Sequence, residues 1–158
     1  MKVREIMTPN PACCTPGTPL LEVAQMFIDH DCGAIPVIES EGNRRPVGIV
    51  TDRDIACRAI AAGKNALALV ARDCMSTPCV IVLPEMSLAE CCEIMERNKI
   101  RRLLVIDKEG NCCGIIAQAD IALRGRERKA AKVVREISRP SRSASRVSDT
   151  LPAASRPL

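Results

Sequence analysis

An internal repeat constrains the fold of this chain more than any other feature. Residues 3–8 align with residues 71–76 at a spacing of 68, and the apolar residues 35–38 align with residues 103–106 at the same spacing. A unit of this size cannot bury its own apolar face and is hardly stable alone. The two copies should therefore pack against each other.

The repeated stretch with the most informative chemistry is residues 48–54, whose counterpart lies 66 residues later at 114–120. The apolar run 46–50 predicts a buried strand, and Thr51 or Asp52 can cap the helix that follows. Free N–H groups at such a junction favour an anion, and a carboxylate there can accept hydrogen bonds from sugar hydroxyls. This arrangement suits a nucleotide.

Each copy predicts the same order of elements. An extended stretch precedes an amphipathic helix, which opens at Thr18 and Pro19 in the first copy and at the Ser87–Glu90 capping box in the second. Two apolar strands joined by a Gly-Asn turn follow and should pair antiparallel. The predicted fold class is α/β (α+β). Each copy forms a small mixed three-stranded sheet with two helices, and the copies pack with pseudo-twofold symmetry around two similar clefts.

The predicted organisation has five parts. They are repeat 1 (1–63), a connector (64–70), repeat 2 (71–124), a basic C-terminal helix (125–138) and a disordered basic tail (139–158). The tail is rich in Arg, Ser, Pro and Ala without periodicity, a composition that cannot bury enough apolar surface to fold.

Charge argues against a nucleic-acid protein. The net charge of +4 divides into +7 for residues 124–158 and −3 for residues 1–123. The body lacks a basic face, and a single aromatic residue, Phe27, offers no stacking platform. No apolar run reaches the roughly 18 residues of a membrane span, and residues 1–7 do not begin a signal peptide. We therefore expect a soluble, cytoplasmic protein with no membrane partner.

The chain has ten cysteines, three adjacent pairs among them, and no Cys-x-x-Cys. Reduced thiols that act as small buried hydrophobes are the main interpretation, with a metal site and a redox switch left as alternatives. The one histidine, His30, suits a surface or capping position. Without a triad or a Walker loop, we expect no catalytic residue, no metal and no required cofactor.

The repeated pattern resembles a known family. Arg-acidic-x-Met-Ser/Thr, a helix, an apolar strand, a Gly turn and Gly-x-x-x-x-x-Asp, present twice within residues 1–124, resemble a tandem CBS domain pair, or Bateman module. The resemblance implies a regulatory homodimer rather than an enzyme. Its ligand would be an adenosine-containing molecule, AMP, ADP, ATP or S-adenosylmethionine, bound between the repeats to shift conformation or dimer surface.

By position, the resemblance implies that Thr51 contacts phosphate and Asp54 contacts ribose, with Arg53 close enough to help. Repeat 2 keeps Asp120 but has Ala117 in place of the hydroxyl residue. We therefore expect one good site, in repeat 1, and one weak or empty site.

Other candidates come from the strand that starts each hairpin. Arg101 and Arg102 could reach a ligand phosphate or form a solvated helix end. Ile35, Pro36 and Val37 could wall the adenine or belong to the core.

An alternative function remains open. The chain could be a ligand-free interaction or dimerisation module that docks on an unknown effector protein through its helices and basic tail. The loss of the hydroxyl at Ala117 favours this alternative slightly.

Overall fold

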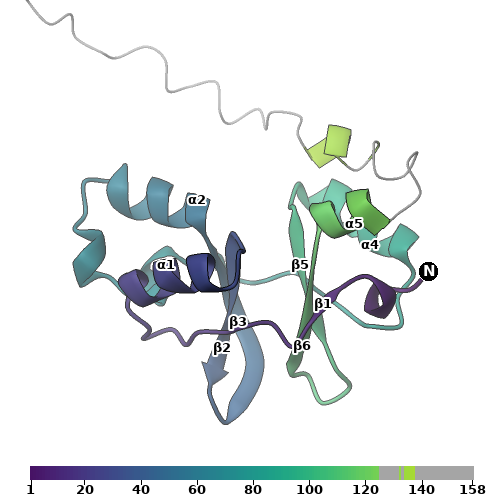
Figure 1. The fold of residues 1–158 in the computed structure, drawn as a ribbon, viewed down its shortest axis with the longest axis horizontal. Coiled ribbons are helices and arrows are strands. Elements are labelled where there is room, and N and C mark those ends of the chain that lie inside the picture. The colour runs from purple at the N-terminus through teal and green to yellow at the C-terminus, as the bar shows by residue number, and fades with distance from the viewer. Residues whose placement is uncertain (125–131, 133, 138–158) are drawn as a thin grey trace, which may run out of the picture.

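The computed structural model describes residues 1–124, 132 and 134–137, and it shows two similar units side by side (Figure 1). The elements in chain order are η1 (Val3–Glu5), β1 (Thr8–Pro9), α1 (Leu20–Asp29), β2 (Ala34–Ser40), β3 (Asn43–Thr51), α2 (Asp52–Ile55), η2 (Ala56–Ile60), η3 (Ala66–Ala68), α3 (Ala71–Cys74), β4 (Ile81–Val82), α4 (Leu88–Asn98), β5 (Arg102–Ile106), β6 (Cys112–Ala117) and α5 (Gln118–Arg124). The predicted mixed α/β repeat is confirmed.

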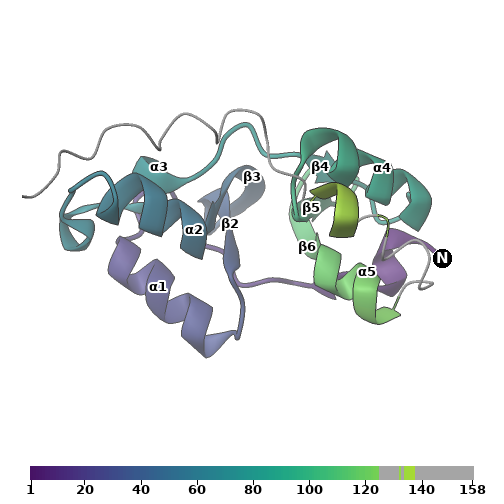
Figure 2. The same ribbon diagram turned by 90° about the horizontal axis from the view of Figure 1, so that it is seen from above.

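Both predicted hairpins form, with β2 antiparallel to β3 and β5 antiparallel to β6. In repeat 2 the strand β4 adds parallel to β5 and completes the mixed three-stranded sheet. In repeat 1 the corresponding contact is reduced to one parallel bridge between Cys14 and Val37, the counterparts of Val82 and Val105. Seen from above, the helices lie outside and the strands of the two units lie between them (Figure 2).

The repeats exchange their leading segments. Val3 N donates to Met86 O of repeat 2 over 3.0 Å, and its counterpart Ala71 N donates to Thr18 O of repeat 1 over 2.8 Å. Val3 is buried in the core of the second unit, and Ala71 is buried in the core of the first. Figure 1 shows the N-terminal segment start on the right-hand unit and cross to α1 on the left. The packed units therefore differ from the sequence units 1–63 and 71–124 in these segments.

The crossing segments lie directly on the motif glycines. A Cβ at Gly48 would stand 2.8 Å from Met75 Sδ and 3.0 Å from Ser76 O, and one at Gly114 would stand 2.5 Å from Met7 Sδ. Antiparallel bridges hold both contacts, Ile49 with Ser76 and Ile115 with Thr8. Glycine fits both places because the other repeat's leading segment approaches so closely.

At the C-terminal end, the described residues 132 and 134–137 are helical, and Ile137 is buried in the core of the second unit. Lys132 Nζ forms an ion pair with Glu96 of α4 over 3.3 Å. The rest of the predicted basic helix and the whole predicted tail lie outside the described residues. Within the described part of the chain, no helix has the length and apolarity to cross a membrane.

Candidate ligand-binding cleft

A cavity of about 400 Å³ lies between the two units. Its walls come from the crossing segment, from the end of α1 and the start of β2, and from the repeat 2 hairpin with α5. The lining residues are Thr8, Asn10, Pro11, Ala12, His30, Asp31, Cys32, Gly33, Ala34, Ile35, Arg102, Ile115, Ala117 and Asp120. Both repeats thus contribute to one cavity, and a molecule bound there would touch both.

Asp120 is the carboxylate of the repeat 2 motif and lies at the start of α5. Its Oδ2 accepts a hydrogen bond from Ala117 N over 2.8 Å, which satisfies one free N–H of the helix. No other side chain that the structure describes donates a hydrogen bond to it. Asp120 therefore keeps acceptor capacity toward the cavity, where Thr8 also supplies a hydroxyl.

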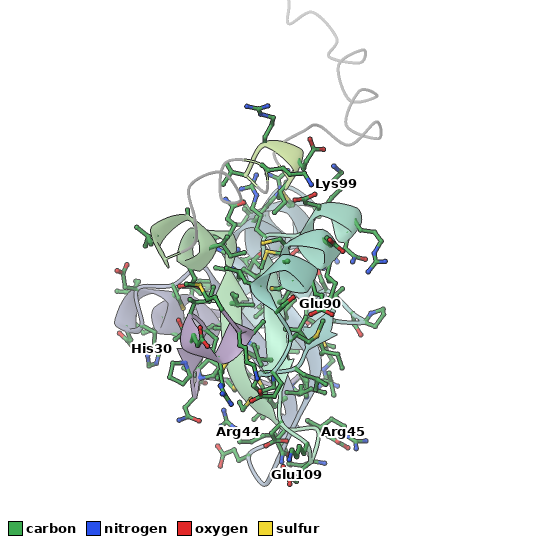
Figure 3. All side chains as sticks on the ribbon, turned by 90° about the vertical axis from the view of Figure 1, so that its right-hand side faces the viewer. His30, Arg44, Arg45, Glu90, Lys99 and Glu109 are labelled. Carbon is green, nitrogen blue, oxygen red and sulfur yellow. The ribbon has the colours of Figure 1, made fainter. Side chains whose placement is uncertain are left out.

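Arg102 supplies positive charge to the same cavity. Its Nη2 lies 3.0 Å from the place that a Cβ at position 33 would occupy, and Asp52 Oδ2 lies at the same distance from that place. Gly33 therefore leaves room for both side chains beside the backbone of the first unit. His30, exposed at the C-cap of α1, is a second nitrogen donor at the cavity edge (Figure 3).

The corresponding corner of repeat 1 is arranged differently. Thr51 and Asp54 form a complete capping box, in which Thr51 Oγ1 donates to Asp54 Oδ2 over 2.8 Å. Arg58 Nη2 lies 3.4 Å from Asp54 Oδ1 and donates to Ser76 Oγ over 3.0 Å. Asp54 and Ser76 are the counterparts of Asp120 and Thr8, and in the repeat 1 corner the Arg58 guanidinium bridges them.

Three of the nine predicted binding residues line the cavity: Ile35, Arg102 and Asp120. Thr51 and Asp54 are occupied in the capping box, and Arg53 is exposed on α2. A ligand role for these three residues stays a prediction.

The remaining candidates have other surroundings. Pro36 and Val37 are buried in the first unit, as the core alternative predicts, and Ile35 is buried in the same core although it borders the cavity. Arg101 is exposed, and its carbonyl accepts from Gln118 N over 2.9 Å.

Several lining residues were not predicted from the sequence. Thr8 belongs to the repeated Ser/Thr position, and because it pairs with Ile115 of the other repeat, it reaches the repeat 2 site. Asn10 and Asp31 adopt left-handed backbone conformations, with φ of 46° and 45°, which no local pattern indicates. The repeat spacing identifies the shared Ser/Thr position. It does not show that the crossing of the segments brings this residue to the site of the other repeat.

The cysteines follow the hydrophobic interpretation in part. Cys14, Cys74, Cys91, Cys92 and Cys112 are buried, whereas Cys57 is exposed. All ten are free thiols. Among the described residues, no three His, Cys, Asp or Glu side chains gather in a way that could hold a metal ion.

Comparison with known proteins gives a consistent result. The family model of the CBS domain matches residues 3–59 and 71–126. The chain is 38% identical to CBS domain-containing protein YhcV of Bacillus subtilis over 121 residues, covering 77% of this chain and 83% of that protein. It is 32% identical to Hypoxic response protein 1 of Mycobacterium tuberculosis over 142 residues, covering 90% of this chain and 97% of that protein.

Two solved structures show the same fold. Hypoxic Response Protein I with two coordinated zinc ions superimposes with a TM-score of 0.69 at 30% identity, covering 78% of this chain and 98% of that one. The CBS domain protein PAE2072 from Pyrobaculum aerophilum, complexed with AMP, superimposes with a TM-score of 0.71 at 24% identity, covering 85% and 99%.

Proposed function

The chain belongs to the CBS domain family, and from this premise we propose that it is a regulatory module that binds an adenosine-containing nucleotide in the cleft lined by Asp120. One observation carries the proposal. The Asp120 carboxylate has a single hydrogen bond from the backbone and side chains that the structure describes, and it lines a cavity that both repeats build. A ribose with two adjacent hydroxyls can satisfy the remaining acceptor positions.

The other lining groups suit the rest of a nucleotide. Ile115 offers aliphatic surface for a base, and Arg102 and His30 offer donors for phosphate. The volume of about 400 Å³ falls in the range of about 300 to 1,000 Å³ typical of small-molecule sites.

The relatives supply background for the ligand class. PAE2072 is described in complex with AMP, so a protein of this fold can hold that nucleotide. In the present chain the proposal depends on the cavity itself, because PAE2072 is only 24% identical.

The proposed mechanism is a population shift. A ligand that touches both units stabilises the relative orientation in which both contacts are made. The surface that a partner meets changes with it, which couples the ligand to an effector. Exposed apolar side chains on the helices of the first unit, Leu21, Ile28 and Ile60, suit a homodimer surface.

The test is a thermal-unfolding panel with AMP, ADP, ATP, NAD and S-adenosylmethionine. An extrinsic dye or calorimetry is needed because the chain has no Trp and no Tyr. A ligand at about 100 times its dissociation constant adds about 2.7 kcal/mol to the free energy of unfolding. The same panel is run on Asp120→Ala and on Asp54→Ala, which is the matched control because each aspartate caps the helix after its motif.

Asp120→Ala should weaken binding by about 10- to 100-fold, the loss of a charged hydrogen-bond acceptor, whereas Asp54→Ala should leave affinity within about twofold. A reversed pattern would move the site to the repeat 1 corner. No response to any adenosine compound by the folded wild type would overturn the proposal.

A further inference from the structure

The strongest unassigned cluster lies at the hairpin end of the molecule, where Figure 3 shows Arg44 beside the turns. Arg44 Nη2 donates to Cys13 Sγ over 3.3 Å and to Pro11 O over 3.3 Å, and its Nε donates to Cys112 O over 3.3 Å. One guanidinium thus holds the sulfur of a repeat 1 cysteine and the backbone of a repeat 2 cysteine.

From this arrangement we propose that Cys13 and Cys112 form an oxidative modification site, in which Cys13 reacts with a hydroperoxide and Cys112 resolves the product to a disulfide. Cys13 is half-buried, which leaves part of it accessible, whereas Cys112 is buried. A small oxidant can therefore reach the first thiol more readily than the second.

The environment activates one thiol and keeps the other protonated. The pKa of Cys13 is lowered to about 7. The largest cause is a hydrogen bond from the Cys112 thiol. Burial opposes it, and the charge and hydrogen bond of Arg44 lower the pKa further. The same pairing, together with burial, raises the pKa of Cys112. The adjacent Cys14 differs, because burial raises its pKa to about 12. Since the thiolate is the nucleophile, Cys13 should react first.

The reaction balances without a metal or a further reductant. The Cys13 thiolate attacks the O–O bond, an S–O bond forms, and the leaving alkoxide takes up a proton to become an alcohol. The sulfur of Cys112 then attacks the sulfenic acid, an S–S bond forms, and water leaves with the Cys112 proton. The two thiols lose two electrons, and the hydroperoxide gains them.

The disulfide would join the crossing segment to β6 across the boundary of the two units. Pro11 and Ala12 of that segment line the ligand cavity. Any effect on nucleotide affinity rests on the function proposed above, whereas the modification itself does not.

The test uses the full reduced chain, treated with a small excess of hydrogen peroxide and mapped by mass spectrometry without reduction. We expect a linked peptide that contains Cys13 and Cys112. Cys112→Ser should instead accumulate a Cys13 sulfenic acid that dimedone traps. Cys14→Ser and Cys113→Ser are the matched controls, because each replaces the neighbour of a reacting cysteine. Both variants should still form the disulfide between Cys13 and Cys112.

Alkylation of Cys13 by iodoacetamide should show a half-maximal rate near pH 7, and Arg44→Ala should move that midpoint up by about one pH unit. Arg45→Ala, the neighbouring substitution, should leave it unchanged. The proposal is overturned if the wild type links other cysteines, or if Cys13 reacts no faster than the half-buried Cys79. These readouts need no ligand, so they can fail independently of nucleotide binding.

Discussion

The two motif corners of this molecule start from the same pattern and reach opposite states. The repeat 1 corner has the complete motif, yet its aspartate is held by Thr51 and by Arg58. The repeat 2 corner lacks the hydroxyl at Ala117, yet its aspartate lines an open cavity. A motif that is intact in sequence can therefore be occupied by its own neighbours, and a degraded motif can remain available.

The cation that pairs with Asp54 in the repeat 1 corner is Arg58. Its guanidinium also donates to the carbonyls of Cys74 and Met75, over 2.7 and 2.8 Å. The Arg58 side chain is 46% exposed, and four contacts hold its guanidinium at this corner. Arg58 is thus already paired with Asp54, and a ligand that used the Asp54 carboxylate would have to displace it.

The largest expected effect is a change in the number of bound ligands. Arg58→Ala removes the guanidinium between Asp54 and Ser76, and should raise the stoichiometry of nucleotide binding from one to two per chain, measured by isothermal titration calorimetry. Arg53→Ala is the control, because it removes an exposed arginine from the same segment.

The double variant Arg58→Ala, Asp54→Ala should return the stoichiometry to one, because the new site needs the freed carboxylate. If Arg58→Ala leaves one site while the wild type binds normally, the guanidinium does not close the repeat 1 corner.

The glycines below the two corners provide the next comparison, in stability. Gly48→Ala places a methyl group against Met75 and against the backbone carbonyl of Ser76, and should lower the free energy of unfolding by about 2 kcal/mol. The three atoms nearest to a Cβ at Gly114 all belong to the Met7 side chain, which can move, so Gly114→Ala should cost about 1 kcal/mol or less.

Urea unfolding measures both changes. Gly42→Ala is the control, because a Cβ there meets nothing within 4 Å, and it should change stability by less than about 0.5 kcal/mol. Equal costs at Gly48 and Gly114 would show that the Ser76 backbone does not set the difference.

The sequence was sufficient for the fold because the repeat carries its own periodicity. Apolar alternation, the capping box of Ser87 and Glu90, and the Gly-Asn turns are local signals, and each matches an observed element. The crossing of the leading segments is a long-range feature. No local pattern indicates that Thr8 pairs with Ile115 rather than with its own repeat.

The site was harder to predict for the same reason. The motif identified Asp54 and Asp120 equally, and an arginine follows each of them by four residues, Arg58 and Arg124. Sequence spacing places Arg58 one helical turn from Asp54, which allows an ion pair, but does not show that Ser76 lies within its reach. Only the packed structure brings Ser76 there.

The smallest expected effect comes from exchanging the residues that distinguish the two motifs. Thr51→Ala removes the hydroxyl that accepts from Asp54 N over 3.1 Å, and should cost about 1 kcal/mol in the free energy of unfolding. Ala117→Thr supplies the missing half of that capping box before α5, where Asp120 already accepts from the backbone of residue 117. We expect it to stabilise the chain by about 0.5 to 1 kcal/mol in urea unfolding.

The same substitution locates the phosphate, because residue 117 lines the cavity. A threonine hydroxyl there can donate to a phosphate oxygen, so Ala117→Thr should tighten AMP by up to about tenfold and leave adenosine unchanged, measured by calorimetry. An equal gain for both ligands would place the new hydroxyl on the nucleoside. Weaker binding of AMP alone would show that the phosphate points away from α5, toward Arg102, and that the missing hydroxyl is what allows the ligand to lie in that direction.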